Sequence, residues 1–178
     1  MLKKAPLLLL FVCTLAVGAM AQQDKSKRPS PPAEMHATLG DLKVDINYSS
    51  PAVKGRTVWG ELVPFGQVWR TGANEATTFE VNKDVLVNGQ KLAAGKYGFF
   101  TIPSEEEWVI IFNKEPNQWG AYNYDEKLDV LRVSAKAGSA PEFNERLSFE
   151  SVTRGDNMLF INIKWENLSV GFLVQPAP

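Results

Sequence analysis

Residues 64–78, which read PFGQVWRTGANEATT, bring together the side chains most able to bind a ligand. Within this stretch, Trp69, Arg70, Asn74 and Glu75 place an indole, a guanidinium, an amide and a carboxylate close together. An indole can stack on a ligand ring while a guanidinium and an amide fix its orientation by directional hydrogen bonds. The same residues allow a structural interpretation, in which Arg70 and Glu75 form a partly buried ion pair and Asn74 ties the loop to backbone groups.

A second stretch, residues 114–127, reads KEPNQWGAYNYDEK and carries Trp119, Tyr122 and Tyr124 in a region too polar to be a strand. Exposed aromatic rings suit sugar or peptide binding, because each ring offers contact area and a polar group at a low entropy cost. The alternative is that the three rings fold back and seal one end of the domain.

A third stretch, residues 50–60, combines glycine turns with one arginine and one tryptophan. Lys54 and Arg56 could bind an anion there, or cover apolar surface with their aliphatic stems. Taken together, the three stretches predict eight ligand-binding residues: Arg56, Trp69, Arg70, Asn74, Glu75, Trp119, Tyr122 and Tyr124.

Other chemistries find little support in the composition. Cys13 lies in the N-terminal apolar run, and His36 is the only histidine, so we expect neither a metal site nor another cofactor. The sequence has no G-x-S-x-G motif for a nucleophilic serine. A pair of carboxylates such as Glu75 and Asp125 could serve a glycosidase-type mechanism, but only if both face one cleft. Whether the protein is an enzyme is left open by the sequence, which favours a protein without catalysis.

The elements that would position these residues are strands. Apolar and polar residues alternate along 42–48 and 79–81, whereas residues 108–112 are apolar throughout, as in a central strand. Residues 129–135 and 146–152 add two strands. Apolar residues at 159–165 and 168–174 lie on either side of Glu166-Asn167, which predicts a hairpin. We therefore expect an all-β fold, a single antiparallel β-sandwich of jelly-roll-like or barrel-like form, with about nine or ten strands and little helix.

The domain organisation follows from composition. Residues 1–21 have the basic start, short apolar core and Ala19-Met20-Ala21 end of a secretory signal peptide. Residues 22–33 are polar and proline-rich, which predicts a disordered linker, and residues 34–175 form the single domain. Cleavage would leave 157 residues with a net charge of −3, because it removes two of 19 basic residues and none of the 20 acidic ones. We expect an exported, periplasmic or extracellular protein with no transmembrane segment and no affinity for nucleic acid.

Several motifs resemble one bacterial family, the domain of unknown function 2911. They include WRTGANEA at residues 69–76, together with YSSPAVKGR at 48–56, AGKY at 94–97, WG at 119–120 and DVLR at 129–132. Their order and spacing are similar over roughly residues 34–174. The resemblance implies an exported protein, common in Bacteroidetes-like bacteria, with no established activity, and it implies no catalytic residue.

Three functions are compatible with these observations. The sequence favours a non-enzymatic periplasmic or extracellular module that binds a glycan or a small polar ligand. The alternatives are an envelope structural or interaction protein, whose arginines would be buried and paired, and a metal-independent, carboxylate-based hydrolase of cell-wall or polysaccharide material. The oligomeric state is left open by the sequence.

Overall fold

The computed structural model of the chain describes residues 24–178. The predicted signal peptide, residues 1–21, and the first two residues of the predicted linker lie outside this part. Within residues 24–178, no helix is both long enough and apolar enough to cross a membrane. The only helices described are two single turns of 3₁₀ helix, η1 (Lys25–Lys27) and η2 (Glu126–Leu128).

Nine antiparallel strands form one sheet, which confirms the predicted all-β class. Along the sheet the strands follow the order β1-β2-β3-β6-β7-β8-β9-β4-β5, so the last strand of the chain lies between β8 and β4. The strands are β1 (Pro32–Leu39), β2 (Leu42–Ser49), β3 (Thr77–Val81), β4 (Val85–Val87), β5 (Gln90–Leu92), β6 (Gly95–Ile102), β7 (Glu107–Asn113), β8 (Asp129–Arg154) and β9 (Met158–Pro176).

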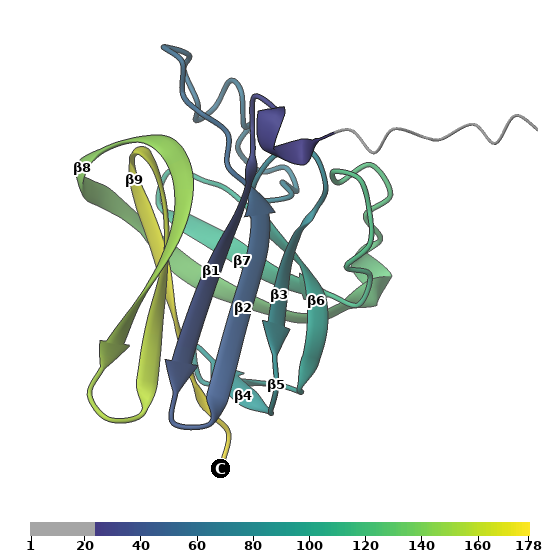
Figure 1. The fold of residues 1–178 in the computed structure, drawn as a ribbon, viewed down its shortest axis with the longest axis vertical. Helices are drawn as coiled ribbons and strands as arrows, with labels where there is room; N and C mark the ends of the chain where they lie inside the picture. Colours follow the sequence, from purple (N-terminus) through teal and green to yellow (C-terminus); the bar gives the residue numbers. More distant parts are fainter. Residues whose placement is uncertain (1–23) are drawn as a thin grey trace, which may run out of the picture.

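The sheet folds over on itself, so its two halves face each other across the main core (Figure 1). Phe79 of β3 and Phe99 of β6 pack against Phe172 of β9, with ring centroids 6.3 and 5.8 Å apart. On β2, Leu42, Val44 and Ile46 lie at alternate positions and are fully buried. Period-two alternation therefore identifies the residues that form the core, as expected for strands covered on one face.

Strands β8 and β9 are longer than the sequence predicts. The expected strands at 129–135 and 146–152 are parts of the single 26-residue strand β8. The expected hairpin at Glu166-Asn167 is wrong, because both runs belong to β9 and each pairs with β8. Glu166 has a φ of 57°, and the ladder between β8 and β9 shifts register there. The buried residues of β9 have odd numbers before this bend and even numbers after it. A hairpin and a β-bulge both change the alternation of buried side chains in this way, so the sequence pattern alone does not distinguish them.

The bend brings the two arms of β9 close to each other. Ser169 Oγ donates a hydrogen bond to Asn162 Oδ1 at 2.8 Å, and a Cβ at Gly171 would lie only 2.0 Å from the Phe160 ring. Figure 1 shows β8 and β9 curving over together at one end of the molecule. The two strands thus extend from one half of the folded sheet into the other.

The segment at residues 24–33 differs from the predicted disordered linker. It contains η1 and the start of β1, and Ser50 N donates to Pro31 O at 2.9 Å. Arg28 binds a carboxylate of the domain through both carboxylate oxygens. The composition predicts correctly that the segment buries little apolar surface. It does not predict the hydrogen bonds and ion pairs that hold the segment against the strands.

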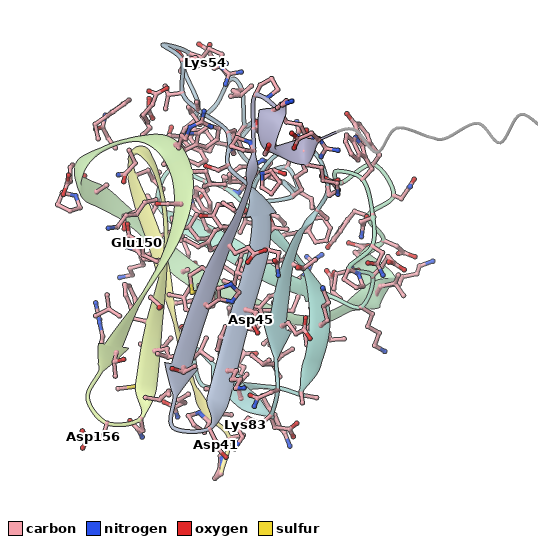
Figure 2. The ribbon with its side chains drawn as sticks, viewed as in Figure 1. Asp41, Asp45, Lys54, Lys83, Glu150 and Asp156 are labelled. Carbon is pink, nitrogen blue, oxygen red and sulfur yellow. The ribbon has the colours of Figure 1, made fainter. Side chains whose placement is uncertain are left out.

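The two ends of the molecule differ in character. Near the end that carries the β1–β2 turn, Lys83 forms an ion pair with Asp41, whereas Lys54 lies on the long loops of the opposite end (Figure 2). Segment η1 lies at the same end as Lys54 (Figure 1). The loops that include Lys54 and the N-terminal segment therefore lie at the same end of the sheet.

Candidate ligand-binding cleft

A cleft with a volume of about 580 Å³ lies between the outer face of the sheet, the N-terminal segment and the 114–125 loop. Strands β2, β3 and β6 supply its floor, and the loop supplies a wall. This volume is within the usual range of small-ligand pockets. The lining residues are Lys25, Pro32, Asn47, Tyr48, Ser49, Glu75, Ala76, Thr78, Lys96, Pro116, Asn117, Gln118 and Trp119.

The 114–125 loop is held in place by a close backbone approach to β6. A Cβ at Gly98 would lie 2.6 Å from the carbonyl oxygen of Glu115, so only glycine leaves room for the loop there. Asn113 is fully buried and binds both ends of the loop: its side-chain oxygen accepts from Glu115 N at 3.0 Å, and its Nδ2 donates to Asp125 O at 3.0 Å. These contacts fix the position of the wall relative to the floor.

The loop also pairs with the WRTGANEA stretch, residues 69–76, through backbone hydrogen bonds. Ala76 N donates to Gln118 O at 2.9 Å, and Gly120 N donates to Asn74 O at 3.0 Å. Glu75 and Trp119 face each other as an isolated antiparallel bridge between these bonds. Two segments about 45 positions apart in the sequence therefore meet at one corner of the cleft, and both predicted loops contribute to it.

Glu75 is the only acidic residue among those that line the cleft, and it is bound by two cations. Arg28 Nη1 donates to both carboxylate oxygens, at 3.1 and 2.9 Å, and Lys25 Nζ lies 2.9 Å from Oε1. Burial would raise the pKa of Glu75, but hydrogen bonds from Lys25, from the backbone and from Arg28 outweigh it and lower the pKa to about 2. The alternative of an Arg70–Glu75 ion pair is therefore wrong: Glu75 takes its partners from the N-terminal segment.

Trp119 is the exposed aromatic group of the cleft. Its ring is 54% exposed, and the guanidinium of Arg28 lies 5.9 Å from the ring centroid. Two buried oxygens of residues that line the cleft, Thr78 Oγ1 on the floor and Gln118 Oε1 on the wall, have no hydrogen-bond partner among residues 24–178. Buried polar atoms are nearly always paired, so these two oxygens are exceptions among the residues that line the cleft.

Trp69 lies in the core instead of the cleft. It is 9% exposed and packs with Trp59, Trp108 and Trp165, at ring-centroid distances of 5.8, 6.2 and 5.9 Å. Its Nε1 donates to Gly72 O at 3.2 Å. Four of the five tryptophans thus form one cluster, in which Trp59 is half-buried and the other three are buried, and Trp119 lies outside it.

Tyr124 belongs to a hydrogen-bonded network under the loop. Its hydroxyl donates to Asp129 Oδ2 and accepts from Arg132 Nη2 at 2.9 Å, and its ring packs 5.1 Å from that of Phe100. Burial and the hydrogen bond to Asp129 raise the pKa of Tyr124 to about 12. These contacts fit the interpretation in which this ring folds back against the sheet.

The other predicted residues lie in different places. Arg56 donates from Nε and Nη2 to two backbone carbonyls, at 3.0 and 2.6 Å. Asn74 Nδ2 donates to Ser30 O at 3.0 Å and so holds the N-terminal segment. Tyr122 is 84% exposed and does not line the cleft. Arg70 is half-buried and also lies outside the lining, so only Glu75 and Trp119 of the eight line the cleft.

Sequence reasoning missed the polar floor of the cleft. Asn47 and Thr78 are partners across β2 and β3, and Lys96 lies on β6. The signal is present for Asn47 and Thr78, because each is a polar residue at an outward position of an alternating strand. Asp125, the proposed second carboxylate, caps η2 by accepting from Lys127 N and does not line the cleft. Within residues 24–178, no cluster of three or more His, Cys, Asp or Glu side chains could hold a metal ion.

Comparison with known proteins finds one family model, described as Protein of unknown function (DUF2911), that matches residues 30–174. The match includes both loops and every residue that lines the cleft except Lys25. No curated protein and no solved structure matches the chain.

Proposed function

Because the chain belongs to the DUF2911 family, whose description assigns no activity, we propose a function from the cleft itself. The protein is a non-enzymatic binding module that holds a glycan or another small polar ligand after export from the cytoplasm. The observation that carries this proposal is the combination, in one cleft, of the exposed Trp119 with the polar residues Asn47, Thr78 and Gln118.

The arrangement suits a ligand with an apolar face and polar edges. Sugars have this form, since their ring C–H groups stack on an indole while their hydroxyls bind amides and hydroxyls. Trp119 offers the stacking face, and Asn47, Thr78 and Gln118 offer donors and acceptors on the floor and the wall.

The charges of the cleft favour binding over catalysis. Glycosidase-type hydrolysis needs two carboxyl groups in one site, one of which carries a proton near neutral pH. Glu75 is the single carboxylate of the lining, and its ion pairs lower its pKa to about 2, so it stays ionised and engaged. Such a group can orient a ligand but is a weak proton donor or acceptor.

Export rests on residues 1–21, with their basic start, apolar core and Ala19-Met20-Ala21 end. The mature protein, isolated from the producing cells, should begin at Gln22. N-terminal sequencing of the periplasmic and extracellular fractions tests this expectation. An intact Met1 on protein confined to the cytoplasm would overturn it.

The binding proposal is tested by calorimetric titration of the protein with neutral glycans chosen from an array. Replacing a central tryptophan of a binding site typically costs about 2 kcal/mol, so Trp119→Ala should weaken binding by roughly 30-fold. Tyr122→Ala is the matched control, because Tyr122 belongs to the same loop but lies outside the cleft. Calorimetry avoids the loss of fluorescence that Trp119→Ala itself causes.

Two results would contradict the proposal. One is the absence of measurable binding across the neutral glycans and small polyols. The other is an equal loss of affinity in Trp119→Ala and Tyr122→Ala, since it would point to the loop surface instead of the cleft.

A further inference from the structure

Arg70 differs from the other arginines of the protein. Its side chain makes no hydrogen bond or ion pair with any residue of the described part, and its Nε is buried without a partner. Burial lowers the pKa of Arg70 below its ordinary value, and the electrostatic effect of Tyr122 opposes this change. The remaining five arginines each bind a carboxylate, a backbone carbonyl or an aromatic ring: Arg28, Arg56, Arg132, Arg146 and Arg154.

The position of Arg70 follows from its neighbour in the chain. The backbone of Trp69 pairs with Thr101 of β6 through two hydrogen bonds, of 2.8 and 2.9 Å, which directs the Trp69 ring into the core. Because side chains alternate along extended backbone, Arg70 points to the other side, where the 114–125 loop covers the sheet. A Cβ at Gly120 would lie 3.7 Å from Arg70 Nη1 and 3.2 Å from the Tyr122 ring. Arg70, Gly120 and Tyr122 therefore form one cluster.

The unpaired guanidinium needs a physical explanation. A guanidinium has five N–H donors and keeps its charge at every accessible pH, so partial burial without an acceptor costs free energy. No carboxylate of the described residues lies within ion-pair distance of it, whereas Arg28 and Arg132 have such partners. A planar fork of donors matches two oxygens of a carboxylate, phosphate or sulfate group.

We propose that Arg70 is the centre of an oxyanion-binding site, with the Tyr122 hydroxyl as a second donor. The site lies outside the cleft, since neither residue lines it, but Gly120 follows Trp119 directly in the same loop. It goes beyond the proposed function, because a free oxyanion can bind at Arg70 whether or not a glycan binds at Trp119. The shared chemistry of its ligand is a group with two or three charged oxygens.

The test measures the arginine directly. Sodium sulfate, acetate and glucuronate are titrated into the wild-type protein at constant ionic strength, and the NMR signal of Arg70 Nε–Hε is followed. We expect a saturable shift, together with a rise in melting temperature over a sodium chloride control. Arg70→Gln should abolish the rise in melting temperature, and Tyr122→Phe should weaken binding several-fold. Arg56→Gln is the matched control and should keep the full response, because Arg56 donates to two backbone carbonyls.

Glucuronate and acetate distinguish the source of the oxyanion. An affinity for glucuronate at least tenfold above that for acetate, lost in Arg70→Gln, supports the acidic group of a sugar as the ligand. Equal affinities that both depend on Arg70 support a free oxyanion.

The proposal is overturned if the Nε–Hε signal does not move, or if sulfate stabilises Arg70→Gln as much as wild type. If Arg70→Gln does not fold, the wild-type NMR titration and the variant Arg70→Lys test the proposal in its place. Lysine keeps the charge but lacks the fork, so it should lose about tenfold in affinity. Neutral-glycan binding by Arg70→Gln stays at the wild-type level under both proposals, so their failures can be told apart.

Discussion

Gly98 offers the most direct test of how the cleft wall is held. In Gly98→Ala, the new Cβ would lie 2.6 Å from the Glu115 carbonyl oxygen and 2.9 Å from Phe100 Cε2. Ordinary contacts of a Cβ begin near 3.4 Å, so the overlap is about 0.8 Å, and one of the atoms concerned is backbone. Overpacking of this kind costs about 1–3 kcal/mol, against a gain of about 0.4–1 kcal/mol because alanine restricts the unfolded chain.

The net expectation is a loss of about 1–2 kcal/mol in the free energy of unfolding. For a domain of this size the melting temperature then falls by about 2–8 °C. The loop from Glu115 to Trp119 has to move outward to accept the methyl group, so ligand binding in the cleft weakens as well. Urea unfolding followed by circular dichroism measures the first effect, and calorimetric titration measures the second.

Gly138 supplies the matched control for this substitution. It also lies in a strand, its φ is not in the left-handed region, and the nearest atom to a new Cβ is Ser169 O at 3.8 Å. Gly138→Ala should therefore be neutral or slightly stabilising. If Gly98→Ala and Gly138→Ala unfold at the same urea concentration, the close approach of the loop to β6 does not hold the wall, and the reasoning is refuted.

Two further predictions concern the floor and the corner of the cleft. Thr78→Val removes an unpartnered buried hydroxyl and keeps the shape of the side chain, so the free energy of unfolding in urea should rise by about 1 kcal/mol. Glycan binding should weaken at the same time. A loss of stability would mean that the hydroxyl is paired. Glu75→Gln should cost at most about 1 kcal/mol at pH 7, because the carboxylate is partly exposed. The pKa of Glu75 is lowered from 4.5 to about 2 by folding, so the stability it adds is present above pH 4.5 and is lost as the pH falls toward 2. Urea unfolding of wild type and Glu75→Gln at pH 7, 4 and 2.5 should show that the difference in their free energies of unfolding shrinks as the pH falls. A difference that persists at pH 2.5, or that the control Glu105→Gln reproduces, would contradict this prediction.

The fold class is readable from the sequence because each strand has one buried face. Leu42, Val44 and Ile46 alternate with polar residues, and such a pattern fits only a half-buried strand. The continuity of β8 and the bend at Glu166 are not readable in this way. A bulge and a hairpin produce the same change of phase, and the choice between them depends on which strand the chain pairs with next.

The candidate site was predictable only in part, for a related reason. Composition indicates that Trp69 and Trp119 are large rings in glycine-rich loops, but it does not say which one the sheet buries. The backbone pairing of Trp69 with Thr101 decides this, and it joins residues distant in the sequence. The partner of Glu75 lies in the segment predicted to be disordered, because charge pairing across about 47 positions leaves no local pattern.

The position of β9 between β8 and β4 has a consequence for how the protein comes to be folded. Val85 to Val87 pair with residues 174–176, about 90 positions further along the chain, so β4 and β5 cannot join the sheet until β9 has been made. Pairings between such distant residues form slowly, since a long loop has to close first. The sheet therefore stays incomplete on this side until β9 is available to pair with both β8 and β4.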